Sequence, residues 1–168
     1  LLFLPFGDSE AADLVRARAD TLHDGITWVA RAVDRVDPEA CTVALEGGDT
    51  LPYDLLVIAS GAEVHPEMTP GLTGLGWKES AFEFYTLPGA EALREAIARF
   101  EGGRFVLNVV ETPIKCPVAP LEMLFLADEH FTKRGIRDKV ELVYATPLDA
   151  AFTKPVAAAA LGELLKKK

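Results

Sequence analysis

A single cysteine in a proline-rich loop is the feature of this sequence best suited to chemistry. Cys116 follows a run of apolar and β-branched residues at 105–110 and stands between Pro113 and Pro120. Proline has no backbone N–H, so this loop cannot surround a pyrophosphate with donors as a glycine-rich loop does. It can instead hold one thiol in place. Lys115 beside the thiol and a helix start just after it both favour the reactive thiolate. The sequence therefore indicates a reactive cysteine, and an inert, buried cysteine is the alternative.

The elements expected around this loop form a βαβ unit. The run at 105–110 is typical of a strand covered on both faces. An apolar segment at 121–131 has helical spacing, with Pro120 suited to the first helical position. A second strand is expected at 140–146. Ligands of open α/β sheets bind beyond the carboxyl ends of strands, and Cys116 would lie at such a position.

The rest of the chain alternates short apolar segments with turns. We expect helical spacing at 8–18, a strand at 25–30 extended by 32–36, a hairpin of 41–45 with a buried run at 51–58, a loop at 63–80, and helices at 88–100 and 156–165. The apolar segment 1–6 has no basic residue before it, so we expect a strand end without its partners rather than a signal peptide. His130 is expected to be exposed on its helix, and Cys41 to be structural.

Composition excludes several classes of function. The 168 residues carry a net charge of −9, which argues against a nucleic-acid partner. Hydrophobic residues make up 49% of the chain, yet no stretch reaches the roughly 18 apolar residues of a membrane helix. Two distant cysteines and three scattered histidines have no metal-ligand spacing, so no metal is expected. Few cysteines are consistent with a reducing, cytoplasmic setting.

Two motifs then resemble a known family. The run Cys116-Pro-Val-Ala-Pro-Leu-Glu122 resembles the redox-cysteine loop of sulfide:quinone oxidoreductases and flavocytochrome c sulfide dehydrogenases. Residues 55–62, Leu-Leu-Val-Ile-Ala-Ser-Gly-Ala, resemble the second FAD motif of flavoproteins with two dinucleotide-binding domains. Ser60 replaces the usual threonine there. The resemblance implies an α/β, Rossmann-like fragment of such a flavoprotein, with residues 1–80 in the FAD domain and 81–168 in an NAD(P)-domain-like second domain.

The same resemblance implies a cofactor and site residues. FAD would be contacted by Val33, Ala59, Ser60 and Gly61. For Val33 a plain core position is an equal alternative. For Gly61 the alternative is a simple turn, which the residues alone favour.

Cys116 would be one of two redox cysteines, and Glu122 would carry protons beside a quinone. A helix-capping role for Glu122 is an equal alternative, because a carboxylate is stabilised at a helix N-terminus.

The function implied is that of a sulfide:quinone oxidoreductase-like flavoenzyme. Sulfide would attack a cysteine disulfide, electrons would pass to FAD, and a quinone or cytochrome would accept them. We expect the chain to be an interior part of a longer protein, inactive by itself. The glycine-rich FAD motif, the second cysteine and quinone-facing helices would lie elsewhere in that protein, giving a cytoplasmic or peripheral inner-membrane location. The alternatives are another FAD-dependent pyridine nucleotide or quinone oxidoreductase, and a non-catalytic sulfur-binding module.

Overall fold

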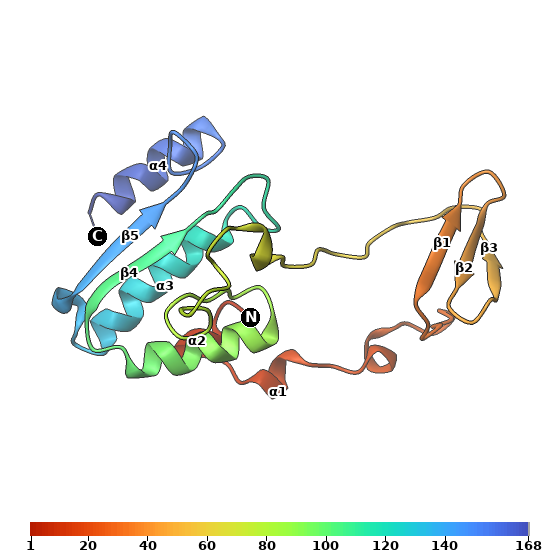
Figure 1. The fold of residues 1–168 in the computed structure, drawn as a ribbon, viewed down its shortest axis with the longest axis horizontal. Helices are drawn as coiled ribbons and strands as arrows, with labels where there is room; N and C mark the ends of the chain where they lie inside the picture. The colour runs from red at the N-terminus through yellow and green to blue at the C-terminus, as the bar shows by residue number, and fades with distance from the viewer. Residues whose placement is uncertain (168) are drawn as a thin grey trace. The chain divides into compact units, whose positions relative to one another are not determined.

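The structure, a computed structural model, describes residues 1–167 as a mixed α/β chain with two compact units (Figure 1). Arg16–Ala62 forms the smaller unit, and Leu1–Val15 joins the chain from Glu63 onward in the larger one. The helices are α1 (Ala11–Leu14), α2 (Leu87–Arg99), α3 (Ala119–Lys133) and α4 (Pro155–Leu165); the strands are β1 (Val33–Asp37), β2 (Thr42–Leu45), β3 (Thr50–Pro52), β4 (Gly103–Asn108) and β5 (Val140–Ala145). These units do not follow the division expected at residue 80, and the assignment of cofactor domains stays a prediction.

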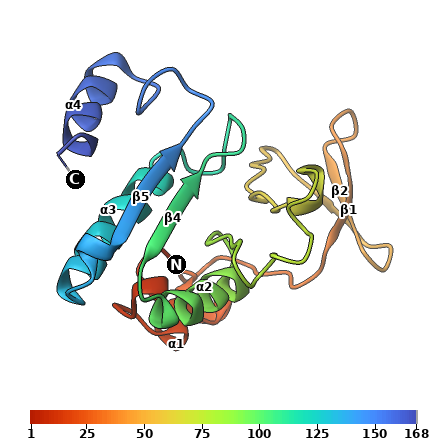
Figure 2. The same ribbon diagram turned by 60° about the vertical axis from the view of Figure 1, so that its left-hand side comes forward.

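The predicted βαβ unit is confirmed in the larger unit. Strands β4 and β5 pair in parallel, in a register from Gly103 opposite Val140 to Asn108 opposite Ala145. Helix α3 connects them and packs against both strands (Figures 1 and 2). It begins at Ala119, so Pro120 takes its second position, where a missing N–H still costs no helical hydrogen bond. The helices expected at 88–100 and 156–165 are confirmed as α2 and α4.

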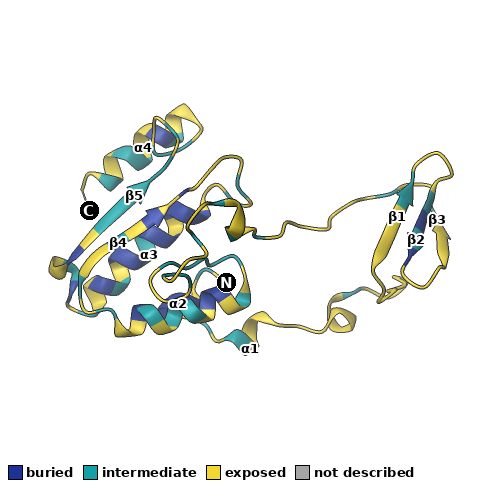
Figure 3. Ribbon diagram, in the orientation of Figure 1, coloured by how far each residue is buried: buried dark blue, intermediate teal, exposed yellow. Residues whose placement is uncertain are grey.

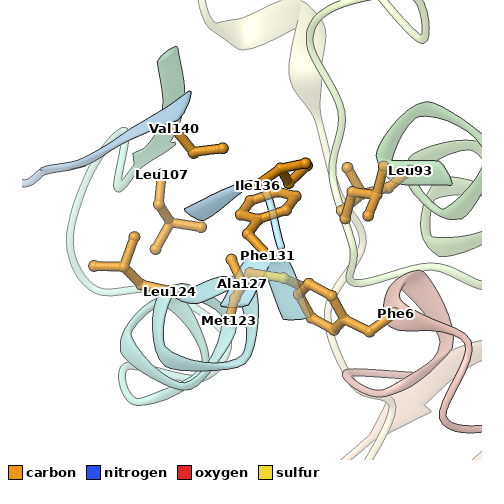
Figure 4. Close-up of a cluster of buried hydrophobic side chains, with 10 residues drawn as sticks. Phe6, Leu93, Leu107, Met123, Leu124, Ala127, Phe131, Ile136 and Val140 are labelled. Atoms are coloured by element: carbon orange, nitrogen blue, oxygen red, sulfur yellow. The ribbon is translucent and has the colours of Figure 1, made fainter. Parts of the chain in front are cut away.

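The core of the larger unit gathers around one aromatic side chain. Phe131 of α3 is fully buried, and its ring lies 5.4 Å from that of Phe100 and 5.5 Å from that of Phe105, measured between ring centroids. Met123 of α3 and Ile97 of α2 are also buried in this cluster. The side chains converge from α2, α3, both strands and the N-terminal segment, as Figure 4 shows. The cluster is therefore what holds α3 against the sheet.

Strand β4 is buried on one face only, so the prediction of a doubly covered strand is wrong. Leu107 is 7% exposed, whereas its neighbour Val106 is 50% exposed. Helix α3 covers the face that carries Leu107, and alternate side chains of a strand point to opposite faces. An apolar run with β-branched residues indicates a strand. It does not show how many faces of that strand are covered, because this depends on how the rest of the protein packs.

The N-terminal segment also departs from expectation. Leu4–Phe6 forms a 3-10 helix whose three side chains are buried, where a strand end without partners was predicted. It packs on α2, and just after it Arg94 of α2 donates two hydrogen bonds of 2.8 and 2.7 Å to the Glu10 carboxylate. The helix expected at 8–18 is limited to α1, because the backbone becomes extended at Val15. Burial of two large apolar side chains decides this conformation.

His130 is half-buried, and the prediction of an exposed residue is wrong. Its ring lies 5.4 Å from the ring of Phe6, because the N-terminal segment covers this part of α3. Burial lowers the pKa of His130, the nearby Arg134 and Lys133 lower it further, and Asp8 opposes them.

The smaller unit is a three-stranded antiparallel sheet with strand order β1-β2-β3. The predicted hairpin is confirmed, but its second arm ends at Pro52 instead of residue 58. No strand forms at 25–30, and β1 begins only at Val33. The apolar residues after β3 are solvent-exposed: Leu55 84%, Val57 77% and Ile58 72% (Figure 3). A buried strand needs neighbours on both edges and cover on both faces, and within residues 1–167 this run pairs with no strand.

The helices found in residues 1–167 are all too short or too polar to cross a lipid bilayer.

Candidate functional site

Cys116 lies in the loop between β4 and α3, as predicted. Its side chain is half-buried, and the helix begins three residues later at Ala119, with Val118 as N-cap. Glu122 lies in the first turn of α3, where its backbone N–H donates to the carbonyl of Val118 at 3.1 Å, and its side chain is exposed. Both residues therefore lie beyond the carboxyl end of β4, at the edge of the sheet where α/β proteins bind ligands.

A tyrosine from outside the βαβ unit reaches the cysteine loop. The hydroxyl of Tyr85 donates a hydrogen bond of 3.3 Å to the backbone carbonyl of Cys116. Tyr85 is partly buried and stands just before α2. The pKa of Tyr85 is raised, mainly by burial and further by the neighbouring Cys116 and Tyr144 side chains. Tyr85 therefore stays a neutral hydrogen-bond donor across the range in which thiols ionise.

The backbone at Tyr85 is held by one carboxylate. Glu83 accepts hydrogen bonds from the N–H of Tyr85 at 2.6 Å and of Thr86 at 2.9 Å, and also from the Thr86 hydroxyl. The Thr86 hydroxyl in turn accepts from the N–H of Gly89 at 3.1 Å and so caps α2. This set of bonds, the Glu83 turn, joins the start of α2 to Tyr85.

Gly89 is the residue that lets the Glu83 turn close. A Cβ at this position would lie 1.9 Å from Glu83 Oε1 and 2.6 Å from the Glu83 backbone oxygen. We expect Gly89→Ala to lower the free energy of unfolding by about 1–3 kcal/mol, the usual cost of overpacking. Gly162→Ala in α4 is the matched control, since no atom lies within 4 Å of a Cβ there. It should gain up to about 1 kcal/mol from helix propensity. Urea unfolding measures both, and equal effects would contradict the close approach.

The larger unit also contains a cleft. It has a volume of about 470 Å³ and lies between α3, the end of β5 and α4. Its lining includes Leu124, Asp128, Tyr144, Thr146, Asp149 and Leu165. A side-chain hydrogen bond between Tyr144 and Thr146 partly offsets the rise in the pKa of Tyr144 caused by burial. Tyr144 thus borders the cleft and also lies near Tyr85.

The residues expected to contact FAD lie in the smaller unit. Val33 begins β1 and is 58% exposed, so the alternative of a core valine is wrong. Ala59, Ser60 and Gly61 are exposed, and no strand leads directly into them, because β3 ends at Pro52. Gly61 has a φ of +80°, a conformation that favours glycine, and open space where a Cβ would be. Small, exposed residues with accessible backbone fit close approach by a cofactor, but their contact with FAD stays a prediction.

The structure brings together only part of the predicted set. Cys116 and Glu122 share the larger unit, while the four expected FAD contacts belong to the smaller one. Sequence reasoning missed Tyr85 and Glu83 because no local signal connects residue 85 to a loop 31 positions away. The helix cap does have a local signal, because Thr86 stands two residues before Pro88 and threonine is a favoured N-cap residue. Among residues 1–167 there is no cluster of His, Cys, Asp and Glu able to hold a metal.

A parallel β-α-β unit with a cysteine in its crossover loop and a separate antiparallel sheet define a mixed α/β protein. No family model matches the chain. It is 26% identical over 163 residues to the mitochondrial sulfide:quinone oxidoreductase of Mus musculus, covering 96% of this chain and 36% of that protein. It is 32% identical over 131 residues to that of Dictyostelium discoideum, covering 77% and 29%. The chain thus spans about a third of the length of these relatives.

Two further comparisons bear on fold and function. The crystal structure of the sulfide:quinone oxidoreductase from Aquifex aeolicus has a TM-score of 0.72 at 21% identity, over 99% of this chain and 39% of that one. The alternative NAD(P)H-ubiquinone oxidoreductase C1 of Arabidopsis thaliana is 32% identical over 103 residues, covering 60% and 19%. The fold and the resemblance to sulfide:quinone oxidoreductases that the motifs indicated are confirmed.

Proposed function

We propose that this chain is part of a flavoprotein that passes electrons from sulfide through a cysteine disulfide and FAD to a quinone. The observation that carries the proposal is the position of Cys116. It stands in the crossover loop of a parallel βαβ unit, in a chain similar to sulfide:quinone oxidoreductases over nearly its whole length.

Cys116 is the residue of this chain proposed to react. In a disulfide with a second cysteine of the whole protein, it would be attacked by sulfide. A new sulfur–sulfur bond would form to one cysteine, and the old one would break to leave the other as a thiolate. Lys115 and the start of α3 lie next to Cys116 and would stabilise that negative charge. FAD, held in part by Val33, Ala59, Ser60 and Gly61, would supply the two-electron oxidising chemistry.

The test is a flavin spectrum of the full-length protein under anaerobic conditions. We expect bound FAD, bleaching of its absorbance on addition of sulfide, and recovery on addition of a quinone. A protein without flavin would instead support the sulfur-binding module.

The similarity to an alternative NAD(P)H-ubiquinone oxidoreductase favours a second candidate, in which NADH reduces the flavin. Bleaching by NADH and not by sulfide would select that candidate. The prolines of the loop oppose it, since they remove donors that a pyrophosphate needs.

Glu122→Gln separates the two roles open for Glu122. If Glu122 carries protons to a quinone, the change removes its titratable group and keeps its volume. Reduction by sulfide should then stay fast while reoxidation by quinone slows by roughly a hundredfold. If Glu122 only stabilises the helix start, turnover should hold and stability fall by at most about 1 kcal/mol. Stopped-flow measurement of each half-reaction decides.

The control for Glu122 is Glu129→Gln. Glu129 is an exposed carboxylate on the same helix, paired with Lys133 at 2.8 Å and far along α3 from the cysteine loop. The same chemical change there should leave both half-reactions unaltered. A reoxidation rate that falls equally in both variants would reject a specific role for Glu122.

A further inference from the structure

Tyr85 and Cys116 come from separate parts of the larger unit and meet through one hydrogen bond. The Tyr85 hydroxyl donates to the Cys116 carbonyl at 3.3 Å, and both residues are half-buried. The bond fastens the middle of the loop that joins β4 to α3. The backbone carbonyl and the side chain of a residue share one Cα, so fixing the carbonyl also restricts where the thiol can lie.

Tyr85 is itself held firmly. The Glu83 carboxylate accepts from the backbone of Tyr85 and of Thr86, and Thr86 caps α2. Gly89 allows the first turn of α2 to approach Glu83 more closely than any side chain would permit. Helix α2 is anchored in the core by Leu93 and Ile97. A continuous set of contacts therefore runs from the core through the Glu83 turn to the cysteine loop.

We propose that Tyr85 is a positioning residue for Cys116, tying the cysteine loop to the capped start of α2. The Tyr85 hydroxyl bonds to the backbone carbonyl of Cys116 and not to its sulfur. Tyr85 therefore acts on the thiol through the backbone. The functional meaning of this inference rests on the redox role proposed for Cys116. The tether, meaning the hydrogen bond from Tyr85 to the cysteine loop, can be tested without measuring catalytic turnover.

The test is the rate of Cys116 alkylation by iodoacetamide in the whole chain, followed by mass spectrometry across a range of pH. Cys41 is an exposed free thiol in the smaller unit and serves as an internal reference. In Tyr85→Phe we expect the Cys116 rate to rise roughly two- to tenfold, the factor that one neutral hydrogen bond contributes to a local opening equilibrium. The Cys41 rate should be unchanged. The pH midpoint of the Cys116 profile should also be unchanged, because the lost phenol is neutral where thiols ionise.

Two further variants test whether the change in the alkylation rate is specific to the hydrogen bond between Tyr85 and the cysteine loop. Tyr144→Phe removes the same atom from a neighbouring ring that bonds to Thr146 instead of the loop, and should leave the Cys116 rate within twofold. Glu83→Gln weakens the turn without altering either tyrosine, and should raise the Cys116 rate in the same direction as Tyr85→Phe. A Cys116 rate unchanged in Tyr85→Phe, or raised equally in Tyr144→Phe, would overturn the proposal. So would a rise at Cys41 matching that at Cys116, which would report general unfolding.

The two proposals fail separately. An unchanged rate of Cys116 alkylation in Tyr85→Phe would reject the positioning role of Tyr85 but would not affect the redox role proposed for Cys116. Normal sulfide oxidation after loss of the Cys116 thiol would remove the redox role, while the alkylation result would still decide whether Tyr85 positions the loop.

Discussion

Sulfide-dependent reduction of the flavin should disappear when Cys116→Ser is introduced into the full-length protein, while FAD stays bound. A serine keeps the size of the side chain, but its hydroxyl is not ionised near neutral pH and cannot form the disulfide that sulfide attacks. The loss should be complete within detection, because the second cysteine alone cannot form the disulfide that sulfide attacks. Anaerobic stopped-flow spectroscopy at the flavin band measures it.

Cys41→Ser is the matched control for this experiment. Cys41 is exposed in the turn before β2, and its thiol donates a long, weak hydrogen bond of 3.7 Å to the Pro38 carbonyl. Its replacement should leave sulfide-dependent reduction intact. Chemical reduction with dithionite should bleach the flavin in all three proteins and so show that the cofactor is present. Sulfide-dependent bleaching in Cys116→Ser at the wild-type rate would refute the redox role.

Phe131→Ala should lower the free energy of unfolding of the larger unit by about 3–5 kcal/mol. Phe131 has no exposed surface and contacts the rings of Phe100 and Phe105, so truncation removes buried apolar area and leaves a cavity among groups from several elements. Domains are stable by only about 5–15 kcal/mol, so a change of this size threatens folding. Urea unfolding followed by far-ultraviolet circular dichroism reports it, because α1 to α4 all lie in the larger unit.

Two substitutions set the scale for that result. Phe131→Leu fills most of the volume and should cost clearly less than Phe131→Ala. Val156→Ala on α4 changes a side chain that is 86% exposed and should stay within about 0.5 kcal/mol of the wild type. A loss below about 1 kcal/mol in Phe131→Ala would mean that the cluster around this ring does not hold the unit together.

Local patterns in the sequence were enough to predict the βαβ unit and the loop that carries Cys116. The apolar spacing of α2 and α3 and the β-branched strands β4 and β5 are signals contained within each element, and prolines mark the loop between them. The motif around Cys116 likewise needed only neighbouring residues. For the same reason the hairpin of β2 and β3 was found, since glycines stand in its turn.

Only the tertiary structure decided which faces are covered and which distant residues meet. The run at Leu55–Ile58 has the composition of a buried strand, yet burial requires neighbours that composition cannot supply. Leu4 and Phe6 are buried because α2 offers them an apolar face, which no pattern within residues 1–6 reveals. Tyr85 reaches Cys116 because the Glu83 turn and the core place two remote segments side by side. Local propensity acts over a few residues, whereas these contacts depend on how the whole chain packs.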